Sequence, residues 1–228
     1  MSHAIPFRAT PALPVAESNQ TFPVGRIYCV GRNYAEHARE MGHDPEREPP
    51  FFFMKPADAI VHNGATIPFP QVTKDLHHEI EMIVAIGRDG AGIPVEKALD
   101  YVFGYGVGLD MTRRDLQGEA KKMGRPWEVG KAFEDSAPCG DIVPASEIGH
   151  PDSGAISLKV NGKTVQQGDL NQLIWKVPET IAYLSGLFRL APGDVIMTGT
   201  PAGVGPVRRG DELYGHIDRV GDLQVKVV

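Results

Sequence analysis

The spacing of apolar and polar residues along the chain predicts many short strands and few helices. Apolar or alternating runs that are bounded by glycine, proline or Asn-Gly are typical of strands, and apolar residues at helical spacing are typical of helices. The runs that predict strands are 26–30, 51–55, 60–61, 65–67, 78–86, 102–109, 156–160, 163–167, 194–198, 211–217 and 223–228. Helices are predicted at 33–40, 96–101, 113–122 and 170–187.

Turn residues refine this picture. We expect 60–61 and 65–67 to pair as a hairpin through Asn63-Gly64, and 156–160 to pair with 163–167 through Asn161-Gly162, because Asn-Gly suits tight hairpin turns. Gly42 is expected to end the first helix, and Pro178 to open the main part of the last one.

The order of the elements predicts the fold class. Strands and helices do not alternate strictly, so we expect an α+β fold around a mixed, bent sheet rather than a doubly wound parallel sheet. Residues 1–24 have little periodicity and carry prolines at positions 6, 11, 14 and 23, which predicts an N-terminal arm that is loosely ordered or covers another part. Residues 25–228 then form one catalytic domain.

Composition narrows the classes of partner. The chain has 228 residues, 42% hydrophobic and 23% charged, as in ordinary globular proteins, and its net charge of −6 disfavours nucleic acid and anionic membranes. Cys29 and Cys139 are too few for a disulfide framework or a zinc site and are expected to pack in the core. Since no run approaches the roughly 20 apolar residues of a membrane span, we expect a cytoplasmic protein without a membrane partner.

Alternating glutamates give the first chemical signal. Glu79 and Glu81 share one face of the predicted strand 78–86, with backbones about 7 Å apart at a rise of about 3.3 Å per residue. Two carboxylates held this close on a partly buried face are costly unless a cation neutralises them. The alternative is a solvated strand face with scattered acids, which is common.

A third acid strengthens the metal interpretation. Asp110 follows the glycine-rich apolar strand 102–109, at a strand end where side chains commonly face a cavity. Three oxygen ligands suit Mg²⁺, Mn²⁺ or Ca²⁺ better than Zn²⁺. His77 and His78 could add ligands, but a histidine is more often a hydrogen-bonded structural residue, so the predicted metal ligands are the three carboxylates.

Longer motifs indicate a family. Glu79-Ile80-Glu81, Gly108-Leu109-Asp110 and the run 192–205, which contains Thr198-Gly199-Thr200-Pro201, resemble the fumarylacetoacetate hydrolase family in their order along the chain. Residues 30–37, 110–117 and 124–127 resemble the bacterial fumarylpyruvate hydrolases and related acylpyruvases. The resemblance implies a β-roll-like mixed fold, a homodimer, and Mg²⁺ or Mn²⁺ on Glu79, Glu81 and Asp110.

The resemblance also implies a reaction, the hydrolytic cleavage of a carbon–carbon bond in a 2,4-dioxo acid. Fumarylpyruvate, an intermediate of aromatic breakdown through gentisate, is the leading substrate, with acetylpyruvate as an alternative. An oxaloacetate decarboxylase or tautomerase would use the same metal site, since chelation of a 2-oxo acid and enolate stabilisation serve those reactions equally well. A metal- and 2-oxo-acid-binding module without turnover is the non-enzymatic alternative.

Three residues are predicted to be catalytic. His37 and Glu40 lie three apart on one helix face, so the carboxylate can fix the imidazole tautomer for water activation, although a fortuitous surface pair has the same spacing. The match to acylpyruvase relatives favours the catalytic interpretation. Lys131 is predicted to stabilise the oxyanion that forms.

Three further residues are predicted to bind substrate. Arg114 and Gln117 share a helix face and correspond to positions that relatives use for substrate oxygens, with Arg113 and Arg125 as competitors. Thr200 could offer its hydroxyl and backbone N–H to the substrate carboxylate, or could belong to a purely structural turn. Tyr34 and Trp127 either line the pocket or pack in the core.

Overall fold

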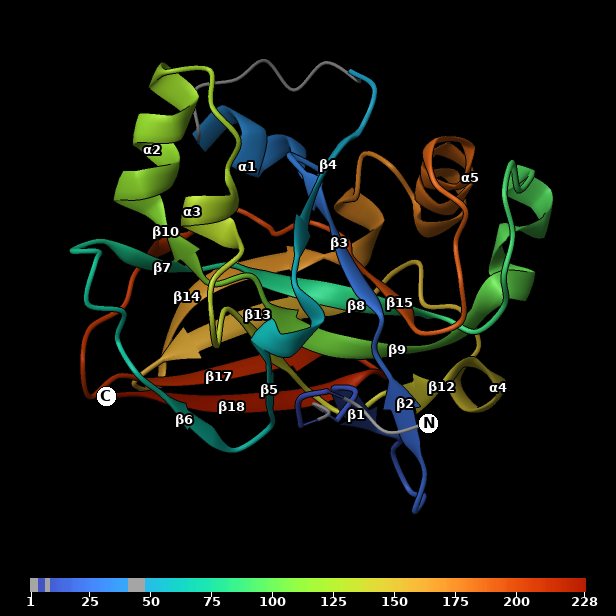
Figure 1. Cartoon of the computed structure of the whole chain (residues 1–228), viewed down its shortest axis with the longest axis horizontal. Helices are drawn as coiled ribbons and strands as arrows, with labels where there is room; N and C mark the ends of the chain where they lie inside the picture. Colours follow the sequence, from blue (N-terminus) through green and yellow to red (C-terminus); the bar gives the residue numbers. More distant parts are fainter. Residues whose placement is uncertain (1–3, 7–8, 41–47) are drawn as a thin grey trace.

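The computed structural model describes residues 4–6, 9–40 and 48–228 and confirms the α+β class (Figure 1). The largest sheet has eight strands. Their order is β4 (Phe51–Lys55), β3 (Arg26–Gly31), β15 (Asp194–Met197), β8 (Ile80–Ile86), β9 (Val102–Leu109), β11 (Ala137–Cys139) and β5 (Ile60–His62), with β12 (Val143–Pro144) also paired to β9.

Three smaller sheets complete the β structure. The five-stranded sheet has the order β14 (Lys163–Asp169), β13 (Ala155–Val160), β17 (Glu212–Ile217), β18 (Gly221–Val227) and β6 (Ala65–Ile67). The three-stranded sheet has the order β10 (Thr112–Arg113), β7 (Leu76–His78) and β16 (Gly205–Pro206). The last one is the N-terminal hairpin of β1 (Ala12–Pro14) and β2 (Thr21–Pro23).

Helices are short and lie outside the sheets. The α-helices are α1 (Ala35–Glu40), α2 (Arg114–Lys122), α3 (Glu128–Lys131), α4 (Ala145–Ile148) and α5 (Val177–Leu187), and the 3₁₀ turns are η1 (Ala57–Ala59), η2 (Val95–Tyr101) and η3 (Leu170–Gln172). Figure 1 shows α1, α2 and α3 gathered at one end of the sheets, near β4, β7 and β10. None of the helices in the described ranges is long and apolar enough to span a membrane.

Successive side chains of β8 point to opposite faces of the sheet and so enter two separate hydrophobic clusters. Ile80, Met82 and Val84 belong to the cluster that packs against apolar residues of β13, β17 and β18, whereas Ile83 and Ala85 face the opposite cluster. The second cluster also contains Leu13 and Phe22, so the N-terminal hairpin covers this face of the eight-stranded sheet. Both cysteines are free and buried in the second cluster, as expected.

The hairpin predicted at 60–67 is wrong in its pairing. The turn forms at Asn63-Gly64, but β5 pairs in parallel with β11 and β6 pairs in parallel with β18, so the two strands belong to different sheets. Strands of three residues have few ladder hydrogen bonds of their own, and pairing with separate sheets satisfies more backbone groups. The second hairpin is confirmed, with Asn161 and Gly162 both at positive φ, as a type I′ turn requires.

Two predicted elements are interrupted in the structure. The strand 78–86 breaks at Glu79 into β7 and β8, because the Ile80 N–H donates to the Gln166 side chain (3.1 Å) instead of continuing one ladder. The helix 170–187 is regular only in α5, with Pro178 in its first turn as expected, since the N–H groups of Ile174 and Trp175 donate to Asn33.

Smaller differences concern helix ends. The first helix begins at Ala35 rather than residue 33, because Tyr34 forms a bridge with Leu173, and the expected stop at Gly42 lies outside the described residues. The helix expected at 96–101 is the 3₁₀ turn η2.

Candidate active site

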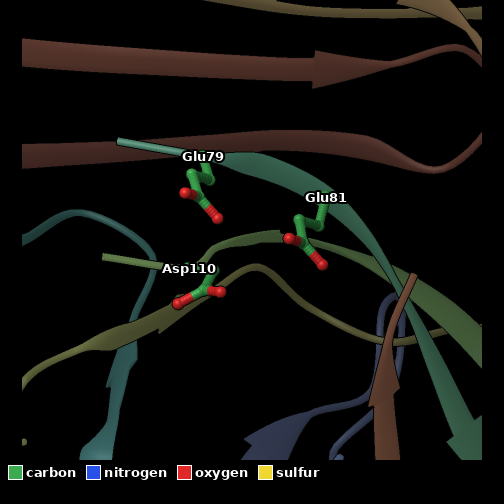
Figure 2. A group of neighbouring side chains, drawn as sticks. All are labelled: Glu79, Glu81 and Asp110. Atoms are coloured by element: carbon green, nitrogen blue, oxygen red, sulfur yellow. The ribbon is translucent and has the colours of Figure 1, made fainter. Parts of the chain in front are cut away.

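Three buried carboxylates converge at one end of the eight-stranded sheet. Glu79, Glu81 and Asp110 each offer an oxygen, and these oxygens lie within 4.8 Å of one another. Figure 2 shows the three side chains pointing toward a common space. The predicted ligand set is therefore brought together, while the solvated-face alternative is wrong because all three side chains are buried.

Strand geometry puts the three acids together. Glu81 is paired opposite Gly108 on β9, and the Asp110 N–H donates to the Glu79 carbonyl oxygen at 2.8 Å, so the ends of β8 and β9 stay aligned. Glycine at position 108 leaves room for the Ile83 side chain, since a Cβ there would lie 2.9 Å from its Cδ1. The glycine-rich strand thus brings Asp110 close to the β8 glutamates.

Buried cations surround the acids. The Lys131 ammonium donates to Glu79 Oε2 (2.8 Å), Asp110 Oδ2 (2.6 Å) and Thr112 Oγ1 (2.7 Å), which uses its three donors. Arg114 forms an ion pair with Glu79, and Lys55 Nζ lies 2.8 Å from Asp110 Oδ1. Among the described residues Glu81 forms no ion pair, and its Oε2 accepts the Gly199 N–H at 2.7 Å.

The surroundings of Glu79 and Glu81 shift their pKa values in opposite directions. Burial disfavours charge on Glu79, but Lys131 and Arg114 outweigh it and hold the pKa of Glu79 well below its usual range. Burial, with the nearby charges of Asp110 and Glu79, raises the pKa of Glu81 well above its usual range. Glu81 is therefore the glutamate whose negative charge a further cation would stabilise most.

The donor set fits a divalent metal. Oxygen-only ligands suit hard cations such as Mg²⁺ and Mn²⁺. Lys131 already acts as a stand-in cation, because its ammonium bridges Glu79 and Asp110 in the same space. Glu81, which lacks a cationic partner in the described part of the chain, would gain one from such an ion.

His37 and Glu40 form the predicted pair on α1. The distance from His37 Nδ1 to Glu40 Oε2 is 3.3 Å, and Glu40 also accepts the Gly203 N–H at 3.2 Å. A carboxylate only accepts hydrogen bonds, so this contact puts the imidazole proton on Nδ1 and leaves Nε2 free to accept one. Burial lowers the pKa of His37 below its ordinary value, so the imidazole is neutral near pH 7.

One pocket unites the predicted residues. Its lining includes His37, Glu79, Glu81, Asp110, Arg114, Gln117, Lys131 and Thr200. Glu40 is not part of the lining but contacts the His37 imidazole. Arg114 Nη1 donates to Gln117 Oε1 at 2.7 Å, and the Thr200 hydroxyl accepts from Gln166 Nε2 at 2.8 Å. The structure thus brings the residues together, and their individual roles stay predictions.

The structure places the other residues that the sequence singled out. Trp127 lines the pocket, whereas Tyr34 is buried in the core. Arg113 stacks on Phe133 at 4.0 Å, and Arg125 is exposed, so neither shares the pocket with Arg114. His77 and His78 bond to Asp75 and Gln166 and do not belong to the carboxylate group.

Sequence reasoning missed several charged residues of the site. Lys55 lies beside Asp110, and Arg32 and Lys121 line the pocket. For Lys55 a signal was present, since it ends the apolar run Phe51-Phe52-Phe53-Met54, and a buried lysine needs partners. Arg32 lies in the motif 30–37, but its position after Gly31 gives no sign that it lines the pocket, and Lys121 stands in a polar segment.

The fold and the site define a class, an α+β protein with a buried oxygen-ligand site that can hold a divalent metal beside a histidine base candidate and several cations. Comparison with known proteins gives the family. The model of the fumarylacetoacetate (FAA) hydrolase C-terminal domain matches residues 26–228, and the chain belongs to this family of enzymes.

Three proteins that are similar to this chain over most of its length illustrate the family. A solved structure of fumarylpyruvate hydrolase from Pseudomonas aeruginosa, in complex with Mn²⁺ and pyruvate, is 56% identical with a TM-score of 0.97, covering 100% of this chain and 99% of that chain. The mitochondrial oxaloacetate tautomerase FAHD1 of Homo sapiens is 43% identical over 201 residues, 88% of this chain and 90% of that protein. An uncharacterised protein of Pyrococcus abyssi is 46% identical over 204 residues, 89% of this chain and 90% of that protein.

Proposed function

We propose that this protein is a metal-dependent hydrolase that cleaves fumarylpyruvate to fumarate and pyruvate, as in aromatic breakdown through gentisate. The observation that carries the proposal is the pairing of a buried carboxylate metal site with the His37–Glu40 pair in one pocket. The 56% identity to a fumarylpyruvate hydrolase over the whole chain supports the choice of substrate.

Glu79, Glu81 and Asp110 would hold Mg²⁺ or Mn²⁺, with Ca²⁺ as an option in vitro. When bound, such an ion polarises the 2-oxo acid end of the substrate and stabilises negative charge on its enolate oxygen. Arg114 and Gln117 would hold substrate oxygens from α2, and Thr200, which lines the same pocket, would hold the substrate carboxylate.

His37 would take a proton from water at Nε2, while Glu40 keeps the Nδ1 proton in place. The water oxygen adds to the C4 carbonyl carbon, and the positive charge of Lys131 stabilises the resulting oxyanion. That role requires Lys131 to exchange one of its three present acceptors for the oxyanion. The C3–C4 bond then breaks, its electrons become the enolate of pyruvate, and the proton held by His37 would pass to C3 to give pyruvate. The other product is released as fumarate when its new carboxyl group gives its proton to solvent.

The test is turnover of fumarylpyruvate, acetylpyruvate and oxaloacetate by purified protein in Mg²⁺, Mn²⁺ or EDTA, followed by ultraviolet absorbance. We expect EDTA-sensitive loss of fumarylpyruvate with the highest kcat/KM of the three. Turnover of oxaloacetate alone would reject the hydrolase and keep the metal site. Turnover of none would favour the binding module.

Oxaloacetate tautomerisation is the second candidate, and the 43% identity to FAHD1 favours it. It needs proton transfer at C3 but no attacking water, and decarboxylation likewise needs no water. A His37→Ala variant should therefore lose hydrolysis far more than oxaloacetate decarboxylation. Equal loss of both reactions would count against His37 as the base that activates water.

We also propose a homodimer, which the family resemblance implies, and a cytoplasmic location, which rests on the sequence features given above. Light scattering after size exclusion measures the mass directly, and twice the chain mass of 24.7 kDa is expected. A monomer mass would reject the dimer.

A further inference from the structure

Two half-buried cations that line the pocket are not used by the mechanism. Arg32 lies between β3 and α1, and Lys121 lies near the end of α2; both line the pocket. The Arg32 guanidinium carbon is 5.4 Å from the centre of the Phe51 ring, and Lys121 Nζ is 4.7 Å from the centre of the Trp127 ring. The centres of the Phe51 and Trp127 rings are 5.2 Å apart, so the two cations lie against one aromatic pair.

These two cations differ from those deeper in the pocket. Lys55, Lys131 and Arg114 each form an ion pair with one of the metal-site carboxylates. Within the described ranges, neither Arg32 nor Lys121 has a carboxylate within ion-pair distance. Glu79 and Asp110 thus face three paired cations, and Arg32 and Lys121 are left without an ion-pair partner in the part of the chain that the structure describes.

The remaining charges are partly removed from water. Both side chains are half-buried, and burial, together with the charges of Arg114 and Arg32, lowers the pKa of Lys121 to about 8. Two like charges held near each other in a half-buried place are unfavourable, and a bound anion would relieve that cost.

The backbone at Arg32 adds an independent observation. Its φ is +57°, in the left-handed region that favours glycine, and an arginine pays a steric cost there. Such strain is characteristic of ligand-binding sites, where the direction of one side chain matters more than local stability. Here it accompanies a side chain that lines the pocket.

We propose that Arg32 and Lys121 form a carboxylate subsite beside the Phe51 and Trp127 rings, which binds the remote carboxylate of a dicarboxylic acylpyruvate. The reacting end lies at the metal-site carboxylates, and the Phe51 and Trp127 rings border the substrate chain that joins the two ends. This inference rests on the proposed function for the identity of the substrate, and, for the subsite itself, on two cations that have no ion-pair partner among the described residues. It makes Arg32 and Lys121 specificity-determining residues that select diacids over monoacids.

The test separates recognition from turnover. Mn²⁺-loaded protein is titrated calorimetrically with 2-oxoheptanedioate and with 2-oxoheptanoate. Both match the chain length of fumarylpyruvate, both lack the 4-oxo group and resist hydrolysis, and they differ only in the remote carboxylate. We expect the wild type to bind the diacid at least about tenfold more tightly, an ordinary effect of charge-assisted hydrogen bonds.

Arg32→Gln and Lys121→Gln should each remove most of this preference and leave the affinity for the monoacid within about twofold, because only the remote contact is lost. Lys122→Gln and Arg125→Gln are matched controls on neighbouring exposed positions outside the pocket lining, and they should keep the wild-type preference.

Two outcomes would overturn the subsite: a wild type that binds both ligands equally, or variants that weaken both ligands to the same degree. Failure of the proposed function gives a different pattern. In that case no acylpyruvate is hydrolysed, while the wild type still prefers the diacid and the two variants lose that preference.

Discussion

Glu79 and Glu81 stand two residues apart on the chain, yet their surroundings give them opposite protonation preferences. Lys131 and Arg114 hold the pKa of Glu79 low, whereas burial beside Asp110 and Glu79 holds that of Glu81 high. Sequence alone predicted that the two side chains share a face, since alternation fixes this. It could not predict the difference, because Lys131 and Arg114 come from distant helices.

His37 should set the acidic side of the pH profile. Burial lowers its pKa from the ordinary value of 6.5, Glu79 and Glu40 raise it, and Arg114 lowers it further. Since only the neutral imidazole accepts a proton, kcat/KM for fumarylpyruvate should be level near pH 7 and fall at a pH below 6.5.

A His37→Asn variant checks this assignment. We expect kcat to fall by about 10²- to 10⁴-fold, the usual contribution of general-base catalysis, and the acidic fall in the profile to disappear. An unchanged acidic fall in the variant would show that another group controls it.

Lys55 should matter for stability. It is 1% exposed, and its ammonium contacts Asp110 and donates to the carbonyl oxygens of Met111 and Lys131. Lys55→Met should lower the free energy of unfolding by about 3–5 kcal/mol, because it leaves a buried carboxylate without that partner. Urea unfolding of metal-free protein measures this.

Lys226→Met is the matched control, because Lys226 pairs with Glu212 on the exposed surface. Its cost should stay within about 1 kcal/mol. Equal losses in the two variants would contradict the role given to Lys55.

At the scale of elements, local patterns predicted the strands better than their partners. The alternation in 78–86 and the Asn161-Gly162 turn gave correct faces and a correct hairpin. Pairing of β5 with β11 and of β6 with β18 joins segments far apart in sequence, and no local pattern encodes such contacts. The break at Glu79 likewise depends on Gln166, which comes from β14.

The backbone conformation of the turn after β15 should affect metal binding by the carboxylates. Gly199 has φ +97°, donates its N–H to Glu81, and would place a Cβ 2.8 Å from Asn33 Cβ. Gly199→Ala should therefore cost about 1–3 kcal/mol from overpacking, beyond the strain of a positive φ, and weaken Mn²⁺ binding.

Gly210→Ala provides the control, because Gly210 has φ +93° with open space around its Cβ position. It should show only the backbone strain, with unchanged Mn²⁺ affinity by calorimetry. Similar losses of stability and affinity at both glycines would refute the coupling.

The whole molecule combines a net charge of −6 with a pocket lined by four cationic side chains, namely Arg32, Arg114, Lys121 and Lys131. The proposed dianionic substrate would therefore be attracted locally although the protein as a whole repels anions. The N-terminal hairpin covers the outer face of the main sheet, while the family match begins at residue 26, so the boundary expected after residue 24 stays a prediction.

The candidate site was largely predictable because its candidate metal ligands and candidate base fall in compact motifs. Eight of the nine predicted residues line one pocket, and the ninth, Glu40, contacts one of them. The cations Lys55, Arg32 and Lys121 escaped prediction, since their importance depends on packing between distant segments.

The most direct test of the central claim is the yield of pyruvate from fumarylpyruvate, measured with lactate dehydrogenase on protein stripped by EDTA and then resupplied with Mn²⁺. We expect no pyruvate from the stripped protein, and one pyruvate for each fumarylpyruvate consumed after Mn²⁺ returns. Pyruvate release that is independent of metal, or no release with metal bound, would contradict a metal-dependent acylpyruvate hydrolase.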